Sequence, residues 1–164
     1  GKQKARIVDL CCGVGFSTRA LQKPFPKSEI MGIDTSKEMI AMAEFIPSHI
    51  NNFSVTSISS HHLQDSCSAS YKAMKKKGYA MKHKAIQCLS CNAEATLLPN
   101  RSVDLVTVLM YAFHEAPKKG REAILQEARR LLSPGGTLAV VDISTDYVPS
   151  KSMLLSGERY VQEY

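Results

Sequence analysis

The first glycine-bearing turn of the chain constrains its fold more than any other feature. Residues 7–10 are apolar apart from Asp9 and form the end of a predicted strand. A turn that holds Gly13 and Gly15 comes next, and Ser17 then opens a predicted helix. A strand that passes through such a turn into a helix is typical of folds that hold a nucleotide at one edge of a parallel sheet.

The residues of this turn favour one kind of ligand over another. A dinucleotide site needs a third glycine three positions after the second, but Thr18 stands there. Asp9 would also repel the phosphates of a dinucleotide. A ligand with an adenosine, no phosphate and a cationic tail suits the turn better, and S-adenosylmethionine has all three properties. A nicotinamide-dependent dehydrogenase is therefore the less favoured interpretation.

The composition is that of one globular domain. The 164 residues are 44% hydrophobic and 22% charged, which allows a single packed core. No apolar run is long enough to span a membrane, so we expect a soluble, intracellular protein. The five cysteines are an odd number and favour reduced thiols, so neither a metal site nor a redox pair is expected at Cys88 and Cys91. The chain begins with Gly1, not Met, and we expect a piece of a longer protein.

Apolar runs and helical patterns alternate along most of the chain. Strands are predicted at residues 5–10, 30–34, 85–91, 103–111 and 137–143. Helices are predicted at residues 17–22, from an N-cap at Thr35 to Ile46, and at residues 121–132. The last helix carries one apolar stripe, formed by Ile124, Leu125, Ala128, Leu131 and Leu132. This order predicts a single α/β domain over residues 1–164 with a Rossmann-like, doubly wound, mostly parallel sheet.

Two parts of the chain depart from that order. Residues 47–84 are predicted to be an inserted loop and helix segment between the second helix and the third strand. Six lysines lie between Lys72 and Lys84 without an acidic residue, and a solvated helix face is favoured over a nucleic-acid or other anionic partner. No clear strand pair follows Ser144, so we expect the sheet to be truncated after its fifth strand.

Several motifs follow one another at compatible spacings. They are D-L-C-C-G-V-G at residues 9–15, G-I-D-T-S at 32–36, N-A-E-A-T-L-L-P at 92–99, a strand and Y-A-F-H-E within 102–115, and E-A-R-R-L-L-S-P-G-G-T-L at 127–138. With these motifs the chain resembles the class I S-adenosylmethionine-dependent methyltransferases. Within that family it is similar to the broad small-molecule group that includes enzymes of the ubiquinone and menaquinone biosynthesis type.

The resemblance implies a site for S-adenosylmethionine. Asp34 ends the second strand and is expected to accept both ribose hydroxyls. The family pattern implies that Asp9 lies near the cofactor's amino group and that Asn92 accepts a hydrogen bond from the adenine amine. Cys11 stands where the family has its first glycine. The residues expected to bind the cofactor are Asp9, Cys11, Gly13, Gly15, Asp34, Thr35, Met39, Asn92, Ala93, Leu109 and Met110.

Methyl transfer to an unidentified small-molecule acceptor is the predicted function. A general base is needed only if the acceptor must lose a proton, and the candidates just beyond the fourth predicted strand are His114, Tyr111 and Glu115. The alternative is a cofactor-binding module, or a truncated and inactive methyltransferase-like scaffold, because the edge strands and an acceptor-binding segment before the first strand are not apparent.

Overall fold

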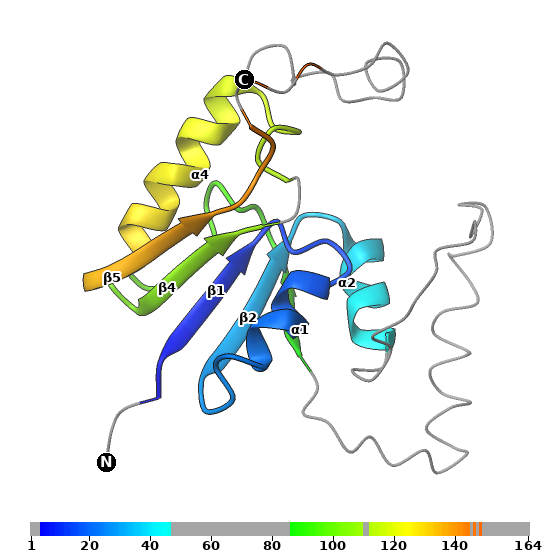
Figure 1. The fold of residues 1–164 in the computed structure, drawn as a ribbon, viewed down its shortest axis with the longest axis vertical. Helices are drawn as coiled ribbons and strands as arrows, with labels where there is room; N and C mark the ends of the chain where they lie inside the picture. Colours follow the sequence, from blue (N-terminus) through cyan, green and yellow to red (C-terminus); the bar gives the residue numbers. More distant parts are fainter. Residues whose placement is uncertain (1–3, 47–85, 110–111, 145, 147, 149–164) are drawn as a thin grey trace.

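The computed structural model describes residues 4–46, 86–109, 112–144, 146 and 148. Within these ranges, five parallel strands form one sheet in the order β3-β2-β1-β4-β5 (Figure 1). The strands are β1 (Arg6–Leu10), β2 (Glu29–Asp34), β3 (Gln87–Ser90), β4 (Val103–Val108) and β5 (Leu132–Val140). This topology confirms the predicted doubly wound, parallel sheet.

Helices cover both faces of β1, which lies at the centre of the sheet. Val8 and Leu10 belong to a buried cluster with the apolar side chains of α4 (Lys118–Leu131). Ile7 points to the other face, where it packs with Leu21 of α1 (Phe16–Gln22). Successive side chains of a strand point to opposite faces, so a strand buried on both faces appears in the sequence as one apolar run.

The register of the strands brings their carboxyl ends to one edge of the sheet. Leu10 of β1 pairs with Ile33 of β2 and with Val108 of β4, and Ile33 pairs with Leu89 of β3. The loops that leave β1, β2, β3 and β4 therefore begin side by side. Ligands bind at this edge in open α/β sheets.

The helix α2 (Lys37–Phe45) follows β2, and its N-cap is Ser36. The hydroxyl of Ser36 accepts a hydrogen bond of 3.2 Å from the backbone N–H of Met39 and donates one of 2.9 Å to Glu38. The expectation that Thr35 caps this helix is therefore wrong by one residue. The reason is that Asp34 accepts a hydrogen bond from the Ser36 N–H, which holds Thr35 in the turn before the cap.

The helix α4 and the strand β5 also differ from the prediction. The helix begins at Lys118 rather than Arg121, and Leu125 of the predicted stripe is 37% exposed. Leu132 is the first residue of β5, because the Pro-Gly-Gly turn is absorbed as an irregularity within the strand. Gly135 permits this with a φ of +82°, a conformation that costs other residues free energy.

Several predictions fall outside the described residues. They concern the insertion at residues 47–84, its lysines from Lys72 to Lys84, Met110, Tyr111 and the segment after residue 148. The extent of the domain therefore stays an expectation. Among the described residues, no helix combines the length and the apolar character needed to cross a bilayer.

Candidate functional site

A crevice of about 450 Å³ lies at the carboxyl edge of the sheet. Its volume is within the range of roughly 300–1,000 Å³ that is usual for small-molecule sites. The residues that line it come from the end of β2, from the loops after β1, β2 and β3, from α2, and from α4 and the segment before it: Cys11, Gly13, Asp34, Thr35, Ser36, Met39, Asn92, Ala93, Glu94, Ala112, Glu115, Ala116 and Ile124. The tertiary structure thus brings Cys11, Gly13, Asp34, Thr35, Met39, Asn92 and Ala93, all predicted from sequence, into one crevice.

The loop after β1 turns tightly above the end of β2. The backbone N–H of Cys12 donates to the carbonyl of Ile33, and Gly15 N–H donates to the carbonyl of Cys12, each at 2.9 Å. Gly13 and Gly15 have φ of +51° and +76°, and Cys11 adopts the same left-handed region at +58°. That conformation costs a non-glycine residue roughly 1–2 kcal/mol, which explains why a glycine is common at the position of Cys11.

Gly32 of β2 makes room for this loop. A Cβ at Gly32 would lie 2.7 Å from the sulfur of Cys12 and 2.8 Å from the hydroxyl oxygen of Thr18. Both distances are shorter than van der Waals contact, so a side chain at this position would push the loop and the start of α1 away from the sheet. Gly32 therefore lets the loop after β1 and the start of α1 lie close to β2.

Asp34 joins the first two loops. Its Oδ2 accepts a hydrogen bond of 2.8 Å from the N–H of Gly13, and its Oδ1 accepts one of 2.9 Å from the N–H of Ser36. A carboxylate offers about four acceptor positions, so capacity for further hydrogen bonds remains. The side chain of Asp34 lines the crevice, where a ligand with two neighbouring hydroxyls can use that capacity.

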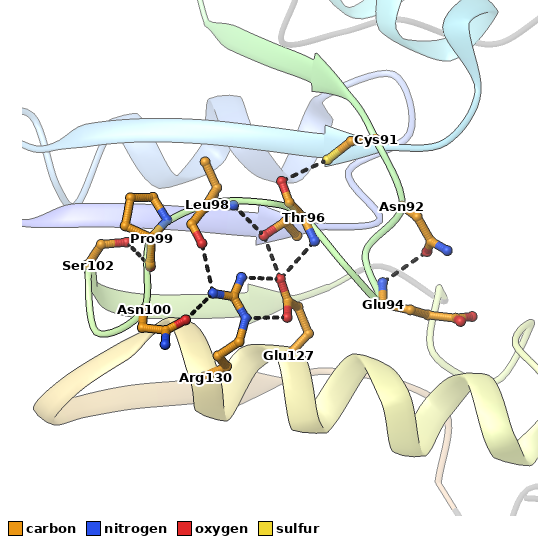
Figure 2. Close-up of polar contacts among 10 residues, drawn as sticks. All are labelled: Cys91, Asn92, Glu94, Thr96, Leu98, Pro99, Asn100, Ser102, Glu127 and Arg130. Carbon is orange, nitrogen blue, oxygen red and sulfur yellow. Dashed lines mark hydrogen bonds and ion pairs between the residues drawn. The ribbon is translucent and has the colours of Figure 1, made fainter.

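The third loop supplies an amide acceptor. The Oδ1 of Asn92 accepts a hydrogen bond of 2.9 Å from the N–H of Glu94 (Figure 2). This hydrogen bond fixes the orientation of the amide, because Oδ1 and not the amide nitrogen must face the N–H. Ala93 beside it is buried at 4% exposure and belongs to the main core cluster. The loop therefore holds the amide oxygen of Asn92 in a fixed orientation, next to Ala93, which is packed in the core.

Negative charge surrounds the crevice. Burial, followed by the charge of neighbouring carboxylates, raises the pKa of the Cys11 thiol to about 12. In decreasing order of effect, these carboxylates belong to Asp34, Asp9, Glu115 and Glu94. The thiol of Cys11 is consequently protonated at neutral pH and unreactive. The same field would stabilise a cation bound beside it.

Asp9 does not line the crevice but lies beneath it, fully buried at 0% exposure. Its Oδ2 accepts hydrogen bonds from the hydroxyls of Ser17 and Thr18 at 2.6 and 2.7 Å, and its Oδ1 accepts one from Thr107 at 2.7 Å. Burial raises the pKa of Asp9, and these hydrogen bonds oppose the rise. The carboxylate connects β1 to α1 and β4 through these hydrogen bonds. It would act on a ligand in the crevice through its negative charge and not by direct contact.

Two other predicted residues also lie away from the lining. Gly15 faces α2 and the residue that precedes β3, because a Cβ there would meet Ala43 at 3.1 Å and Ile86 at 2.5 Å. Leu109 packs with Ile7 and its neighbours in the cluster beneath α1. Both residues shape the surroundings of the crevice. Their direct contact with a cofactor stays a prediction, as does that of Met110.

His114 follows β4 and is buried, with 2% of its side chain exposed. Its Nδ1 lies 2.5 Å from Oδ1 of Asp142, and its backbone N–H donates to Oδ2 of the same residue at 2.9 Å. Burial disfavours the charge of Asp142, but the hydrogen bonds from His114 and from the Ile143 N–H lower its pKa below the usual value. Asp142 stands after β5, and a carboxylate just after a strand is the signal that would have placed it at this edge of the sheet.

The fold, the turn after β1 and the crevice together define a nucleotide-binding α/β domain, and a comparison with known proteins identifies its family. Residues 8–140 match the methyltransferase-domain family. The chain therefore belongs to this family, the class I S-adenosylmethionine-dependent methyltransferases. The resemblance found in the sequence motifs is confirmed.

Individual relatives agree with this assignment. The demethylmenaquinone methyltransferase of Bacillus velezensis is 28% identical over 144 residues, which are 87% of this chain and 47% of that protein. The trans-aconitate 2-methyltransferase of Methylobacterium nodulans is 51% identical over 39 residues, 24% of this chain and 15% of that protein. The chain thus spans less than half the length of the curated relatives that it matches.

A solved structure shows the same fold. Phosphoethanolamine N-methyltransferase 2 of Haemonchus contortus, crystallised with S-adenosyl-L-methionine, superposes with a TM-score of 0.62. The superposition covers 98% of this chain and 30% of that one, at 18% sequence identity. The shared fold extends beyond the segments that are similar in sequence.

Proposed function

We propose that this domain binds S-adenosylmethionine in the crevice and transfers its methyl group to a small-molecule acceptor. The position of Asp34 is the observation that carries the proposal. Its carboxylate lies between the loops after β1 and β2, is held by the N–H groups of Gly13 and Ser36, and lines the crevice. This is a rigid acceptor for two ribose hydroxyls.

The other lining residues suit the remaining parts of the cofactor. Met39 lies at the crevice with 44% of its surface exposed, where it can cover one face of a purine. Asn92 presents its oriented amide oxygen from the opposite loop. The cationic methionine end would lie beside Cys11 and Gly13, in the negative field of Asp9, Asp34 and the two glutamates.

Bound S-adenosylmethionine supplies an activated methyl group, since its sulfonium leaves as a neutral thioether when the acceptor's electron pair forms the new bond. The domain's part is to hold the acceptor atom in line with that methyl group, and such positioning contributes much of the rate. His114 and Tyr111 are the proposed bases for an acceptor that must lose a proton. The Asp142 carboxylate at 2.5 Å would stabilise the imidazolium that forms on His114.

Relatives favour a small molecule as the acceptor. Demethylmenaquinone and trans-aconitate are the substrates named for the two relatives compared above. The two differ widely in chemistry, because one cofactor site serves many acceptors in such folds. The class of acceptor, a small molecule, is therefore proposed, and the individual compound is not.

The replacement Asp34→Ala tests the cofactor site. It removes two charge-assisted hydrogen bonds to the ribose, each worth roughly 1.5–3 kcal/mol, so we expect binding to weaken at least about 100-fold. Isothermal titration with S-adenosylhomocysteine measures this loss. Asp104→Ala is the matched control, because Asp104 is the second residue of β4, at the opposite end of the sheet, and accepts a hydrogen bond from the Arg6 N–H. The affinity of the Asp104→Ala variant for S-adenosylhomocysteine should equal that of the wild type.

Equal affinities of the wild type and Asp34→Ala would contradict the assignment of the crevice. Transfer of a labelled methyl group from the cofactor to candidate small-molecule acceptors then tests the reaction. Binding without transfer to any acceptor, in this chain and in longer forms of the protein, would favour a cofactor-binding module instead.

A further inference from the structure

The loop between β3 and β4, residues 91–102, carries Asn92 and Ala93 of the crevice but contains no helix or strand. Two of its non-glycine residues, Leu97 and Arg101, have left-handed φ angles of 59° and 52°. Leu97 is 92% exposed, so apolar packing of its side chain does not hold this backbone in place. Since each left-handed residue costs roughly 1–2 kcal/mol, other contacts must stabilise the loop.

Two side chains of α4 make these contacts (Figure 2). The Oε1 of Glu127 accepts hydrogen bonds from the N–H and the hydroxyl of Thr96 at 2.7 and 2.6 Å. Arg130 donates to both oxygens of Glu127, to the carbonyl of Leu98 at 2.8 Å and to the side chain of Asn100. Glu127 and Arg130 thus bind the middle and the far end of the loop to one helix.

Burial and charge make this connection specific. Glu127 is 6% exposed and Thr96 is 2% exposed. The hydrogen bonds from Arg130, followed by those from Thr96, hold the pKa of Glu127 at about 2 against the effect of burial. A buried carboxylate that stays ionised depends on all of its partners, and loss of one partner is costly. The Thr96 carbonyl in turn accepts a hydrogen bond from the Cys91 thiol, directly before Asn92.

We infer that Glu127 and Arg130 are positioning residues for purine recognition: through Thr96 they hold the loop so that the Asn92 amide faces the adenine. This inference rests on the proposed function. It assigns a ligand-directed role to a segment whose sequence indicates only a helix and a turn. Neither residue lines the crevice, so their effect on the ligand passes through residues 91–98.

Two replacements of Thr96 separate this role from general stability. Thr96→Val keeps the shape but removes the hydroxyl donor to Glu127, whereas Thr96→Ser keeps both donors and is the matched control. The probes are S-adenosylhomocysteine and S-inosylhomocysteine, which differ in replacing the adenine amine by a carbonyl. We expect the wild type and Thr96→Ser to prefer the adenosine ligand. In Thr96→Val we expect that preference to fall about tenfold, because hydrogen bonds to charged groups are worth roughly 1.5–3 kcal/mol.

Arg130→Lys provides a second test if Thr96→Val does not fold. It keeps the charge beside Glu127 but loses the planar fork that reaches Leu98 and Asn100, so the preference should fall here too. An unchanged preference in a folded Thr96→Val or Arg130→Lys protein would overturn the inference. A wild type that binds both ligands equally would overturn it and leave the proposed function standing. A wild type that binds neither ligand would overturn both.

Discussion

Asp9 and Asp34 stand near the ends of neighbouring strands, but only Asp34 reaches the crevice. The side chains of a strand alternate between its two faces, and Asp9 shares the face of Ile7, which α1 covers. Three hydroxyl groups satisfy its carboxylate there. Asp34 is the last residue of β2, and its carboxylate turns into the loops. Position along the strand, and not the residue type, separates the buried carboxylate of Asp9 from that of Asp34, which lines the crevice at the very end of its strand.

The buried charge of Asp9 should be visible in the pH dependence of stability. The folded pKa of Asp9 is raised above 3.8, so the folded state binds its proton more tightly than the unfolded state does. The stability that this protonation contributes is present below about pH 3.8 and is lost as the pH rises through the folded pKa. Asp9→Asn cannot titrate at this position. Its unfolding free energy should therefore increase relative to that of the wild type as the pH rises through this range. Urea unfolding at a series of pH values measures the difference, and parallel curves would contradict the prediction.

At the scale of elements, the start of α2 connects fold and site. Asp34, Thr35 and Ser36 all line the crevice, and the helix begins directly after them. The cap is formed by Ser36 because the carboxylate of Asp34 has already bound the Ser36 N–H and Gly13 N–H. The helix start and the proposed ribose contact therefore depend on one set of hydrogen bonds.

Replacing the two candidate caps one at a time tests this arrangement. Ser36→Ala removes the acceptor of the Met39 N–H and should lower the unfolding free energy by about 1 kcal/mol. Thr35→Ala is the matched control and should change it by less than about 0.5 kcal/mol. Chemical denaturation of both variants without ligand gives the values. A larger loss in Thr35→Ala than in Ser36→Ala would assign the cap to Thr35 after all.

At the scale of the whole molecule, the crevice is a junction of segments that are distant in sequence. Its lining includes residues from Cys11 to Ile124, which come from both sides of the central strand β1. A ligand that touches all of them would connect one half of the sheet to the other. Binding and global stability are therefore linked.

Thermal unfolding should show this linkage. At about 100 times its dissociation constant, a ligand that binds only the folded state stabilises it by about 2.7 kcal/mol, or roughly 5–10 °C for a domain of this size. We expect S-adenosylhomocysteine to raise the Tm by this amount in the wild type and not in Asp34→Ala. NAD at the same concentration serves as the ligand control. A larger shift with NAD would favour the dehydrogenase interpretation.

Local patterns in the sequence determined the class of fold and much of the crevice. The alternation of apolar runs and helical stripes, the turn around Gly13 and the carboxylate at Asp34 were readable because each depends on neighbours along the chain. The same local character explains the errors. Whether Thr35 or Ser36 caps α2 depends on which N–H groups the Asp34 carboxylate binds. Whether the Pro-Gly-Gly turn ends one element or lies inside the next depends on pairing with β4.

Only the tertiary structure decided how the buried polar groups around the crevice are paired. Asp9 meets Thr107 across 98 positions of sequence, Thr96 meets Glu127 across 31, and His114 meets Asp142 across 28. In each case a polar group became buried because the sheet brought distant segments together, and burial made a partner necessary. Residue type and spacing limit which groups can pair, but the choice among them is made when the strands take their order in the sheet.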